Sequence, residues 1–241
     1  MIVTKQQLEE KTTSIRDEQF NQSEISLIPT LETQGLTFGN SGKYFYATVL
    51  YIDIRQSSKL LDCHHYANVA KLLTAFYNAI VRVANQDGGE IRSFNGDSLL
   101  VFYKGTENDT VGKAVKSAMK MSFAINNVVN PIMKNLSNID FGIGIDYGKV
   151  LVTKVGIGGS LNNKDLIWIG NGVNRATKIS DQCQSPCHIG ISERLYNKLD
   201  YPLRYTKDLF NRSKPMWTSK TFEYNEGAEK MYQTCYHFII S

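Results

Sequence analysis

The chain has 241 residues, of which 42% are hydrophobic and 21% charged, with a net charge of +4. This composition is typical of a globular protein with a real core, and so modest a charge does not call for nucleic acid binding, although it is compatible with a small polyanionic ligand. The four cysteines form neither a CxxC pair nor a zinc pattern, so we expect reduced thiols. With no leader-like start and no apolar run of about 20 residues, we expect a cytoplasmic protein without membrane association.

The first half of the chain predicts a polar extension followed by a core domain. Residues 1–43 are polar, with a sparse helical stripe over 5–20 and a glycine-containing linker over 35–43. A strand is expected over 44–54 because β-branched and aromatic residues dominate there. Apolar residues then recur at helical spacing from 58 to 84, with a break at 63–65, which indicates two helices.

The remaining elements follow from turn and cap signals. A hairpin over 90–103 turns at Asn95 and Gly96, and a helix over 109–129 is expected to end at Asn130 and Pro131. Beyond it we expect strands at 139–145 and 150–155 around a turn at 146–149, a loop at 156–164, a strand at 166–169, a helix at 171–183, a strand at 188–191, a helix capped by Ser192, a polar tail over 207–233 and a strand at 236–240. This order predicts an α+β fold, with a mixed or antiparallel sheet and helices on one face.

Two aspartates stand at strand ends. Asp53 closes the strand over 44–54, and Asp97 lies in the hairpin turn before the apolar run that begins at Leu99. Because neighbouring strands lie about 5 Å apart, two such carboxylates can converge on a divalent cation. The alternative is that both are ordinary turn aspartates, since Asp favours turns.

Four segments carry a resemblance to a known family. They are residues 51–57 (YIDIRQS), 95–97 (NGD), 142–150 (GIGIDYGKV) and 169–178 (IGNGVNRATK), in this order. Together they resemble the successive signatures of class III nucleotidyl cyclases. The resemblance implies a ferredoxin-like βαββαβ core over about 44–206, completed by a tail over 207–241, and a head-to-tail homodimer with active sites at its interface.

The resemblance also implies a metal site. Asp53, Asp97 and the backbone carbonyl of Ile54 would hold two divalent cations, Mn²⁺ or Mg²⁺. One cation would lower the pKa of the attacking ribose 3′-hydroxyl, and the other would neutralise the triphosphate of the nucleoside triphosphate substrate.

Residues next to the metal site are the candidate substrate contacts. The segment 54–58 matches the turn whose backbone N–H groups cradle the triphosphate, with Gln56 and Ser57 where the family has glycine and an aromatic residue. Further candidates from this turn and from the hairpin are Arg55, Ser58 and Gly96.

Asn174 and Lys178 lie four residues apart, hence on one face of the predicted helix. The resemblance implies that Asn174 orients the ribose. Lys178 occupies the position of an arginine that stabilises charge on the α-phosphate, and it offers a point charge without the guanidinium fork. The alternative is a surface lysine on an amphipathic helix. Arg175 should point about 100° away from this face.

Base recognition departs from the purine cyclases. The lysine and aspartate that read adenine are replaced by Ser93 and Ile167, and the glutamate and cysteine of guanylate cyclases are absent as well. Tyr51 shares a strand face with Asp53, where its ring could narrow the base pocket. Alternatively, Tyr51 and Ile167 pack only in the core.

A narrower pocket favours a smaller base. The combination is similar to the pyrimidine cyclases of bacterial anti-phage Pycsar systems, whose product activates a separate effector protein. We therefore expect conversion of UTP to 3′,5′-cyclic UMP, with CTP as the next substrate. Rival interpretations are an adenylate cyclase with atypical base contacts, a degenerate domain that binds nucleotide as a regulator, and a diguanylate cyclase. The last has a similar hairpin at 94–98, but the second glycine and the acidic neighbour of its motif are missing here.

Overall fold

The computed structural model describes residues 3–63, 65–157 and 163–240. The chain divides into a smaller unit, residues 1–45 with 149–170, and a larger unit, residues 46–148 with 171–241. Two long strands, β2 (Ser41–Ile54) and β5 (Phe141–Gly156), contribute residues to both units. The predicted loop at 156–164 falls largely outside the described residues.

The smaller unit contains α1 (Lys5–Asp17), β1 (Asn21–Glu24) and β6 (Lys164–Ile169). The start of β2 pairs with β1 in parallel, and the end of β5 pairs with β6 in antiparallel orientation. The predicted helix is confirmed as α1, which buries no residue, as its sparse apolar stripe suggested. The predicted linker over 35–43 is too long, because β2 already begins at Ser41.

The larger unit contains most of the sheet. Its strands run in the order β10-β11-β7-β5-β2-β4-β3, with β7 parallel to β5 and the pairs β10–β11, β11–β7, β2–β4 and β4–β3 antiparallel. Its elements are α2 (Ser57–Cys63), α3 (Tyr66–Gln86), β3 (Glu90–Asn95), β4 (Ser98–Lys104), α4 (Glu107–Phe123), η1 (Ala124–Val129), α5 (Asn130–Met133), α6 (Asn171–Asp181), β7 (Ile189–Ser192), α7 (Glu193–Lys198), α8 (Tyr201–Arg204), β8 (Tyr205–Lys207), β9 (Ser213–Pro215), β10 (Thr218–Tyr224) and β11 (Gly227–Thr234). The two helices predicted between 58 and 84 and the hairpin predicted over 90–103 are confirmed.

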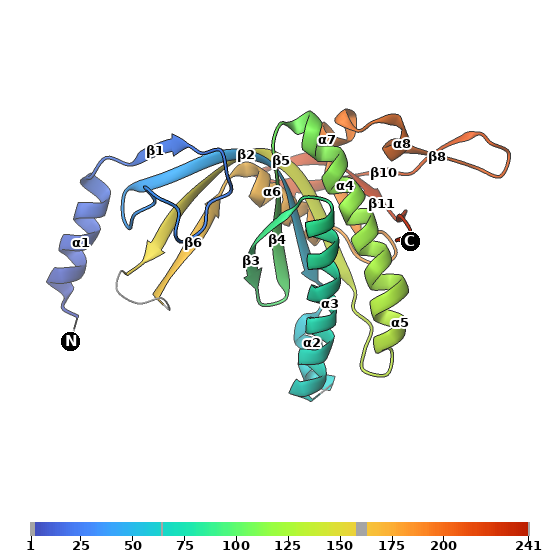
Figure 1. The fold of residues 1–241 in the computed structure, drawn as a ribbon, viewed down its shortest axis with the longest axis horizontal. Coiled ribbons are helices and arrows are strands. Elements are labelled where there is room, and N and C mark those ends of the chain that lie inside the picture. Colours follow the sequence, from blue (N-terminus) through green and yellow to red (C-terminus); the bar gives the residue numbers. More distant parts are fainter. Residues whose placement is uncertain (1–2, 64, 158–162, 241) are drawn as a thin grey trace. The chain divides into compact units, whose positions relative to one another are not determined.

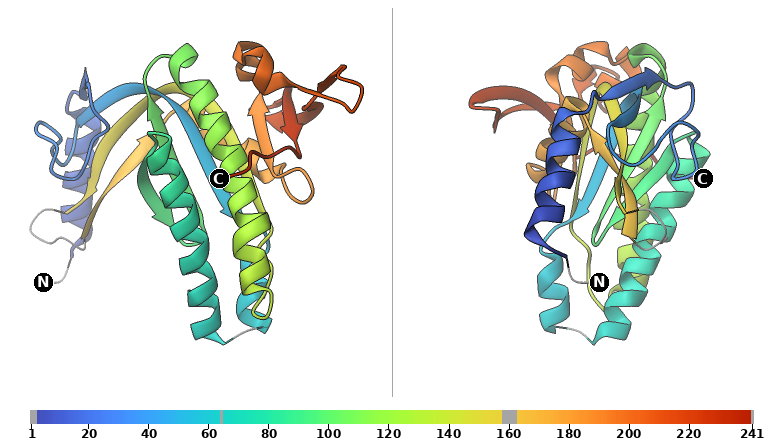
Figure 2. Two further views of the ribbon diagram at one scale, coloured as in Figure 1. Left: turned by 45° about the vertical axis from the view of Figure 1, so that its right-hand side comes forward. Right: turned by 90° about the vertical axis from the view of Figure 1, so that its left-hand side faces the viewer.

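The two faces of the sheet in this unit carry different helices. Side chains alternate along β5, so Ile143 and Ile145 enter the main core with residues of α3 and α4. Helices α3 and α4 run side by side over this face (Figure 1; Figure 2). Gly142 and Gly144 point the other way, where a Cβ atom on either would collide with the backbone of α6. The predicted α+β fold with a mixed sheet is confirmed. The expectation that helices cover one face is not, because α6 packs on the opposite face of β5, where two glycines leave it room.

The predicted helix end at Asn130 and Pro131 is wrong. The chain stays helical from α4 through the π-helical segment η1 into α5, and Pro131 lies in the first turn of α5. Proline lacks the N–H that would bond the preceding helical turn, and the chain passes it through the π-helical segment, whose hydrogen bonds include Asn130 N–H to the carbonyl oxygen of Ile125. The N-cap of α4 is Thr106, which accepts from the N–H of Asp109.

The predicted turn at 146–149 is also wrong, because β5 continues through it. Asp146 is fully buried, which is compatible with a strand because its carboxylate is compensated. It accepts hydrogen bonds from Arg175 Nη1 at 2.9 Å and from Ser192 Oγ at 2.7 Å.

The C-terminal segment differs from its prediction as well. The expected strand at 236–240 does not form, and the polar tail instead supplies the hairpin of β10 and β11. Cys187 and Cys235 form a disulfide rather than two reduced thiols. They are 48 residues apart in sequence, and the antiparallel pairing of β7 with β11 brings them together. Among the described residues, no helix is long and apolar enough to cross a membrane.

Candidate active site

Asp53 lies at the end of β2, on the face of the sheet opposite the main core. Its neighbours Ile52 and Ile54 are buried in that core, so the alternation of the strand turns Asp53 the other way. Asp53 pairs with Ser98 across β2 and β4, and the N–H of Ile54 bonds the carbonyl oxygen of Asp97 at 3.3 Å. The structure thus brings both predicted aspartates together. Burial, and next the charge of Asp97, raises the pKa of Asp53 to about 6.

The hairpin turn that carries Asp97 is held by a tyrosine. Gly96 adopts a φ of +64°, a left-handed conformation that glycine tolerates best. Tyr77, on α3, donates a 2.7 Å hydrogen bond to the carbonyl oxygen of Gly96, and its ring packs edge-on against Phe94 at 5.4 Å. Burial, followed by the charges of Asp97 and Asp53, raises the pKa of Tyr77 to about 12.

Tyr77 was not among the residues predicted for the site. The signal was nonetheless present, because Tyr77 lies four residues after Leu73 and three before Ile80, on the apolar stripe of α3. A tyrosine on a buried stripe needs a partner for its hydroxyl.

The donor set fits divalent cations. No cluster of three or more His, Cys, Asp or Glu side chains within the described residues is placed to hold a metal ion. However, Mg²⁺ is commonly held by one or two carboxylates together with substrate phosphates. Asp53 and Asp97 are hard oxygen ligands whose mutual repulsion a cation would relieve.

The predicted phosphate turn follows Asp53 directly. Gln56 has a φ of +55°, so it adopts the left-handed backbone that the family's glycine would adopt more easily. Ser57 opens α2, and Ser58 is exposed in its first turn. The guanidinium of Arg55 turns inward, where it bonds Asp53 Oδ2 at 3.0 Å and carbonyl groups at the end of α6.

The predicted base-pocket residues of β2 and β3 share the face of Asp53. Tyr51 lies opposite Leu100 on β4, and Leu100 lies opposite Ser93 on β3, so the three form one cross-strand row. A bulge at 91–93 in β3 sets this register. The pKa of Tyr51 is raised, chiefly by burial. Leu100 is a further residue in this row that the sequence analysis did not select.

Ile167 belongs to the smaller unit. It lies on β6 opposite Thr153 of β5, and 40% of its surface is exposed. Its side chain is therefore not simply core packing within that unit.

The exposed face of α6 carries both Asn174 and Lys178, as their spacing predicts. Lys178 Nζ lies 3.8 Å from Asp181, whose other oxygen lies 3.9 Å from Arg55 Nη1. Lys178 is thereby connected to Asp53 through Asp181 and Arg55. As expected, Arg175 points elsewhere, to Asp146 and Glu229.

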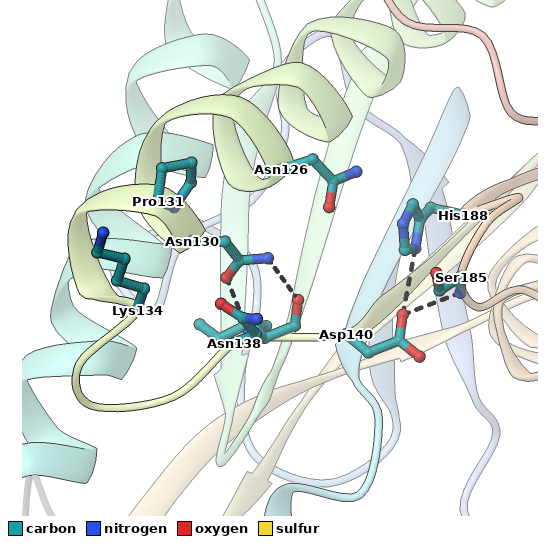
Figure 3. A pocket seen from close by; sticks show the side chains of 9 residues that line it. Asn126, Asn130, Pro131, Lys134, Asn138, Asp140, Ser185 and His188 are labelled. Atoms are coloured by element: carbon teal, nitrogen blue, oxygen red, sulfur yellow. Dashed lines mark hydrogen bonds and ion pairs between the residues drawn. The ribbon is translucent and has the colours of Figure 1, made fainter.

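A separate polar pocket of about 510 Å³ lies beside η1 and α5 (Figure 3). The side chain of Asn130 bonds the backbone of Ile139 there, and His188 Nδ1 lies 3.3 Å from Asp140 Oδ1. None of the residues that line this pocket is one of the predicted site residues.

Comparisons with known proteins agree with this geometry. Residues 40–232 match the family model of the adenylate and guanylate cyclase catalytic domain. A uridylate cyclase of Burkholderia cepacia is 26% identical over 186 residues, which is 76% of this chain and 78% of that protein. One from Rhodovulum sp. (strain MB263) is 25% identical over 92% of each chain, and one from Gulbenkiania mobilis is 30% identical over 69% of this chain and 66% of its own length.

Solved structures share the fold. The crystal structure of a guanylyl cyclase superposes with a TM-score of 0.65 at 21% identity, covering 82% of this chain and 95% of that one. The adenylyl cyclase CyaB from P. aeruginosa superposes with a TM-score of 0.64 at 20% identity, covering 80% and 95%.

Proposed function

Because the chain belongs to the adenylate and guanylate cyclase catalytic-domain family, and is therefore a nucleotidyl cyclase, we propose that its substrate is UTP and its products are 3′,5′-cyclic UMP and pyrophosphate. In this reaction the ribose 3′-oxygen forms a bond to the α-phosphorus and loses its proton. The bond from the α-phosphorus to the bridging oxygen breaks, and pyrophosphate leaves.

The row of Tyr51, Leu100 and Ser93 beside Asp53 is the observation that carries the pyrimidine assignment. It offers a large ring and two uncharged side chains, and it lacks the lysine with which adenylate cyclases bind the purine edge. A pocket with hydrogen-bonding side chains discriminates strongly against bases that leave those side chains unpaired. A narrow apolar pocket instead excludes the larger purine bases by their size. The uridylate cyclases of B. cepacia and Rhodovulum, similar over most of this chain, support the same substrate.

The proposed reaction assigns a separate role to each of the predicted site residues. Asp53 and Asp97, with the backbone carbonyl of Ile54, would hold two divalent cations, Mg²⁺ or Mn²⁺. Such ions supply charge neutralisation and a lowered pKa for the attacking hydroxyl. Asn174 would orient the ribose, and Lys178 would place its positive charge near the α-phosphate.

The backbone at Gln56 and Ser57, together with the first turn of α2, would bind the triphosphate. The first N–H groups of a helix lack partners within the helix and favour anions. Ser58 and Gly96 border this turn and remain candidate substrate contacts, and Ile167 remains a candidate for the base pocket.

The substrate is tested by incubating the purified protein with each of the four nucleoside triphosphates and Mn²⁺ and identifying the products by mass. We expect cyclic UMP as the main product. Cyclic CMP in excess would favour the cytidylate alternative, and preferential cyclic AMP would contradict the pyrimidine proposal. Asp97→Ala should abolish turnover while the protein stays folded.

We further propose a homodimer with active sites at its interface. Within one chain, Lys178 approaches Asp181 rather than either metal-site aspartate, which is compatible with Lys178 acting in a partner's site. Mixing the inactive variants Asp97→Ala and Asn174→Ala tests this arrangement. Random exchange of subunits places one intact site in half of the dimers, so about a quarter of wild-type activity should return. A mixture as inactive as its components would contradict shared sites.

The biological role is also a proposal. By its resemblance to the pyrimidine cyclases of anti-phage systems, the product would act as a second messenger for a separate effector protein. Challenging cells that carry this chain together with a candidate effector tests the role, because Asp97→Ala should remove any protection from phage.

A further inference from the structure

We propose that Arg55 is a positioning residue, which fixes the Asp53 carboxylate for metal binding and joins it to α6. This inference rests on the proposed metal-dependent function of the same site. It assigns to the Arg55 side chain a role within the protein, where its sequence position alone had suggested a contact with substrate.

The guanidinium of Arg55 is occupied by groups of its own chain. Its Nη1 donates to Asp53 Oδ2 at 3.0 Å, and its Nε donates to the carbonyl oxygen of Cys183 at 3.0 Å. Its Nη2 donates to both the carbonyl oxygen and the hydroxyl of Ser180, at 2.5 and 2.9 Å. Four of the five N–H donors of an arginine are thus used, and only 16% of the side chain is exposed.

The partners of Arg55 on α6 are the groups that most need a cation. The last carbonyl groups of a helix have no partner within the helix, and they form the negative end of its dipole. Ser180 lies in the last turn of α6, where its carbonyl oxygen also accepts from the N–H of Cys183 at 2.8 Å, and Cys183 lies two residues beyond the helix. One guanidinium therefore satisfies the end of α6 and the carboxylate of Asp53 together.

The neighbouring strand is shaped to admit this contact. Ser180 Oγ donates to the carbonyl oxygen of Gly142 on β5 at 2.9 Å. A Cβ atom at Gly142 would collide with Nη2 of Arg55 and would lie 2.5 Å from the carbonyl oxygens of Ser180 and Cys183. The absence of a side chain at Gly142 leaves the space in which Arg55 reaches α6.

Arg55 therefore connects two parts of the proposed active site that come from different elements. Asp53 belongs to the metal site, and α6 carries Asn174 and Lys178. Arg55 connects them, because it donates hydrogen bonds both to Asp53 at the end of β2 and to Ser180 in the last turn of α6. Groups that orient a metal ligand from outside commonly change metal affinity or activity by 10–100-fold when mutated.

The test compares Arg55→Lys with Arg175→Lys. Lysine keeps the positive charge and loses the fork, so the comparison isolates geometry from electrostatics. Arg175 is a matched control, because it also ties α6 by a fork to two carboxylates, Asp146 and Glu229, and 23% of its side chain is exposed. It makes no contact with Asp53 among the interactions of the described residues.

The readout is Mn²⁺ affinity without nucleotide, followed by the electron paramagnetic resonance signal of free Mn²⁺, together with the thermal unfolding midpoint. We expect Arg55→Lys to bind Mn²⁺ at least about tenfold more weakly, and raised Mn²⁺ to restore part of its activity. Arg175→Lys should unfold at a lower temperature and bind Mn²⁺ within about twofold of wild type. Unchanged affinity in Arg55→Lys, or equal weakening in both variants, would overturn the proposal.

A second pair of variants, with smaller changes to the side chains, tests the proposal if Arg55→Lys does not fold. Ser180→Ala removes one hydroxyl from the link and should weaken Mn²⁺ binding severalfold. Thr177→Ala removes a hydroxyl of α6 that bonds Val173 within the helix, and it should leave the affinity unchanged. Equal affinities in the two variants would contradict the link. If the wild-type protein cyclised no nucleotide at all, the proposed function would fail while these titrations still decided the role of Arg55.

Discussion

The hydroxyl of Tyr77 donates a 2.7 Å hydrogen bond to the carbonyl oxygen of Gly96, which joins α3 to the residue directly before Asp97. The hairpin turn of the proposed metal site is thereby hydrogen-bonded to α3. Its position is set by the main core as well as by its own glycine.

Tyr77→Phe should loosen this turn. The ring still packs against Phe94, so only the hydrogen bond is lost, at a cost of about 1 kcal/mol in the free energy of unfolding. In a chain of this length such a loss lowers the midpoint by about 2–4 °C. Because Asp97 loses its anchor, we expect severalfold weaker Mn²⁺ binding in a titration without nucleotide.

Tyr147→Phe is the matched control for this prediction. Tyr147 donates to the carbonyl oxygen of Gly105 at 3.2 Å, so it removes the same kind of bond at a distance from both aspartates. It should lower stability by a similar amount and leave Mn²⁺ affinity unchanged. If both variants bound Mn²⁺ equally well, Tyr77 would be a stabilising residue without a role at the site.

Gln56→Gly should stabilise the protein. Gln56 has a φ of +55°, and a non-glycine residue in this conformation costs about 1–2 kcal/mol. Glycine removes that strain and adds about 0.5–1 kcal/mol of entropy cost on folding, so we expect a small net gain. The backbone of the proposed phosphate turn is retained, and the KM for substrate should stay within about twofold.

The Gln56 side chain also accepts a hydrogen bond from Lys59 Nζ at 3.0 Å. Lys59→Met removes this bond without changing the backbone, which separates the two effects in a denaturant titration. A clear loss of stability in Gln56→Gly, beyond that of Lys59→Met, would show that the turn is not strained.

Asp146→Ala should destabilise the fold strongly. Its fully buried carboxylate binds Arg175 and Ser192, and removing one partner of a buried ion pair costs about 3–5 kcal/mol. Glu229 remains beside Arg175 at 2.8 Å, so we expect the lower end of this range. Urea unfolding measures the change.

Glu229→Ala is the comparison for Asp146→Ala. Glu229 is partly exposed, and such ion pairs contribute about 1 kcal/mol or less. A cost for Asp146→Ala as small as that for Glu229→Ala would contradict a stabilising role for the buried Asp146–Arg175 ion pair.

His188 should make stability depend on pH. Its ring stacks on Phe141 at 4.1 Å, and Nδ1 donates to the carbonyl oxygen of Phe141 at 2.9 Å. Burial lowers the pKa of His188 below its ordinary value of 6.5, against the opposing effects of that hydrogen bond and of Asp140. The folded state thus binds a proton less readily than the unfolded state.

The direction in which stability changes with pH follows from the lowered pKa of His188. The stability that His188 contributes is fully present above pH 6.5 and is lost as the pH falls through the lowered pKa of the folded state. Urea midpoints between about pH 5 and 8 should fall less steeply toward acid in His188→Gln than in the wild type. Asp140 at 3.3 Å and Lys134 in the same pocket are the other charged groups facing this region. Identical slopes would contradict the prediction.

Part of the candidate site was predictable from local pattern. Strand alternation put Tyr51 and Asp53 on one face, and helical spacing put Asn174 and Lys178 on one face. Local sequence pattern gave wrong predictions where contacts outside the local segment determined the structure. Asp146 has the sequence pattern of a turn, but Arg175 compensates its charge within the strand. Pro131 has the pattern of a helix end, but the chain stays helical through it.

Local sequence alone was enough to predict the chemistry, because four ordered segments resemble the cyclase family and two strand-end aspartates mark the proposed metal site. The contacts that hold these residues in place could be found only from the folded chain. Arg55 meets its partners on α6 at separations of 125 and 128 residues, and Tyr77 meets Gly96 from another element. Periodicity and turn preference are properties of a few adjacent residues, whereas such contacts depend on the order of β5, β2 and β4 in the sheet and on the helices packed against it.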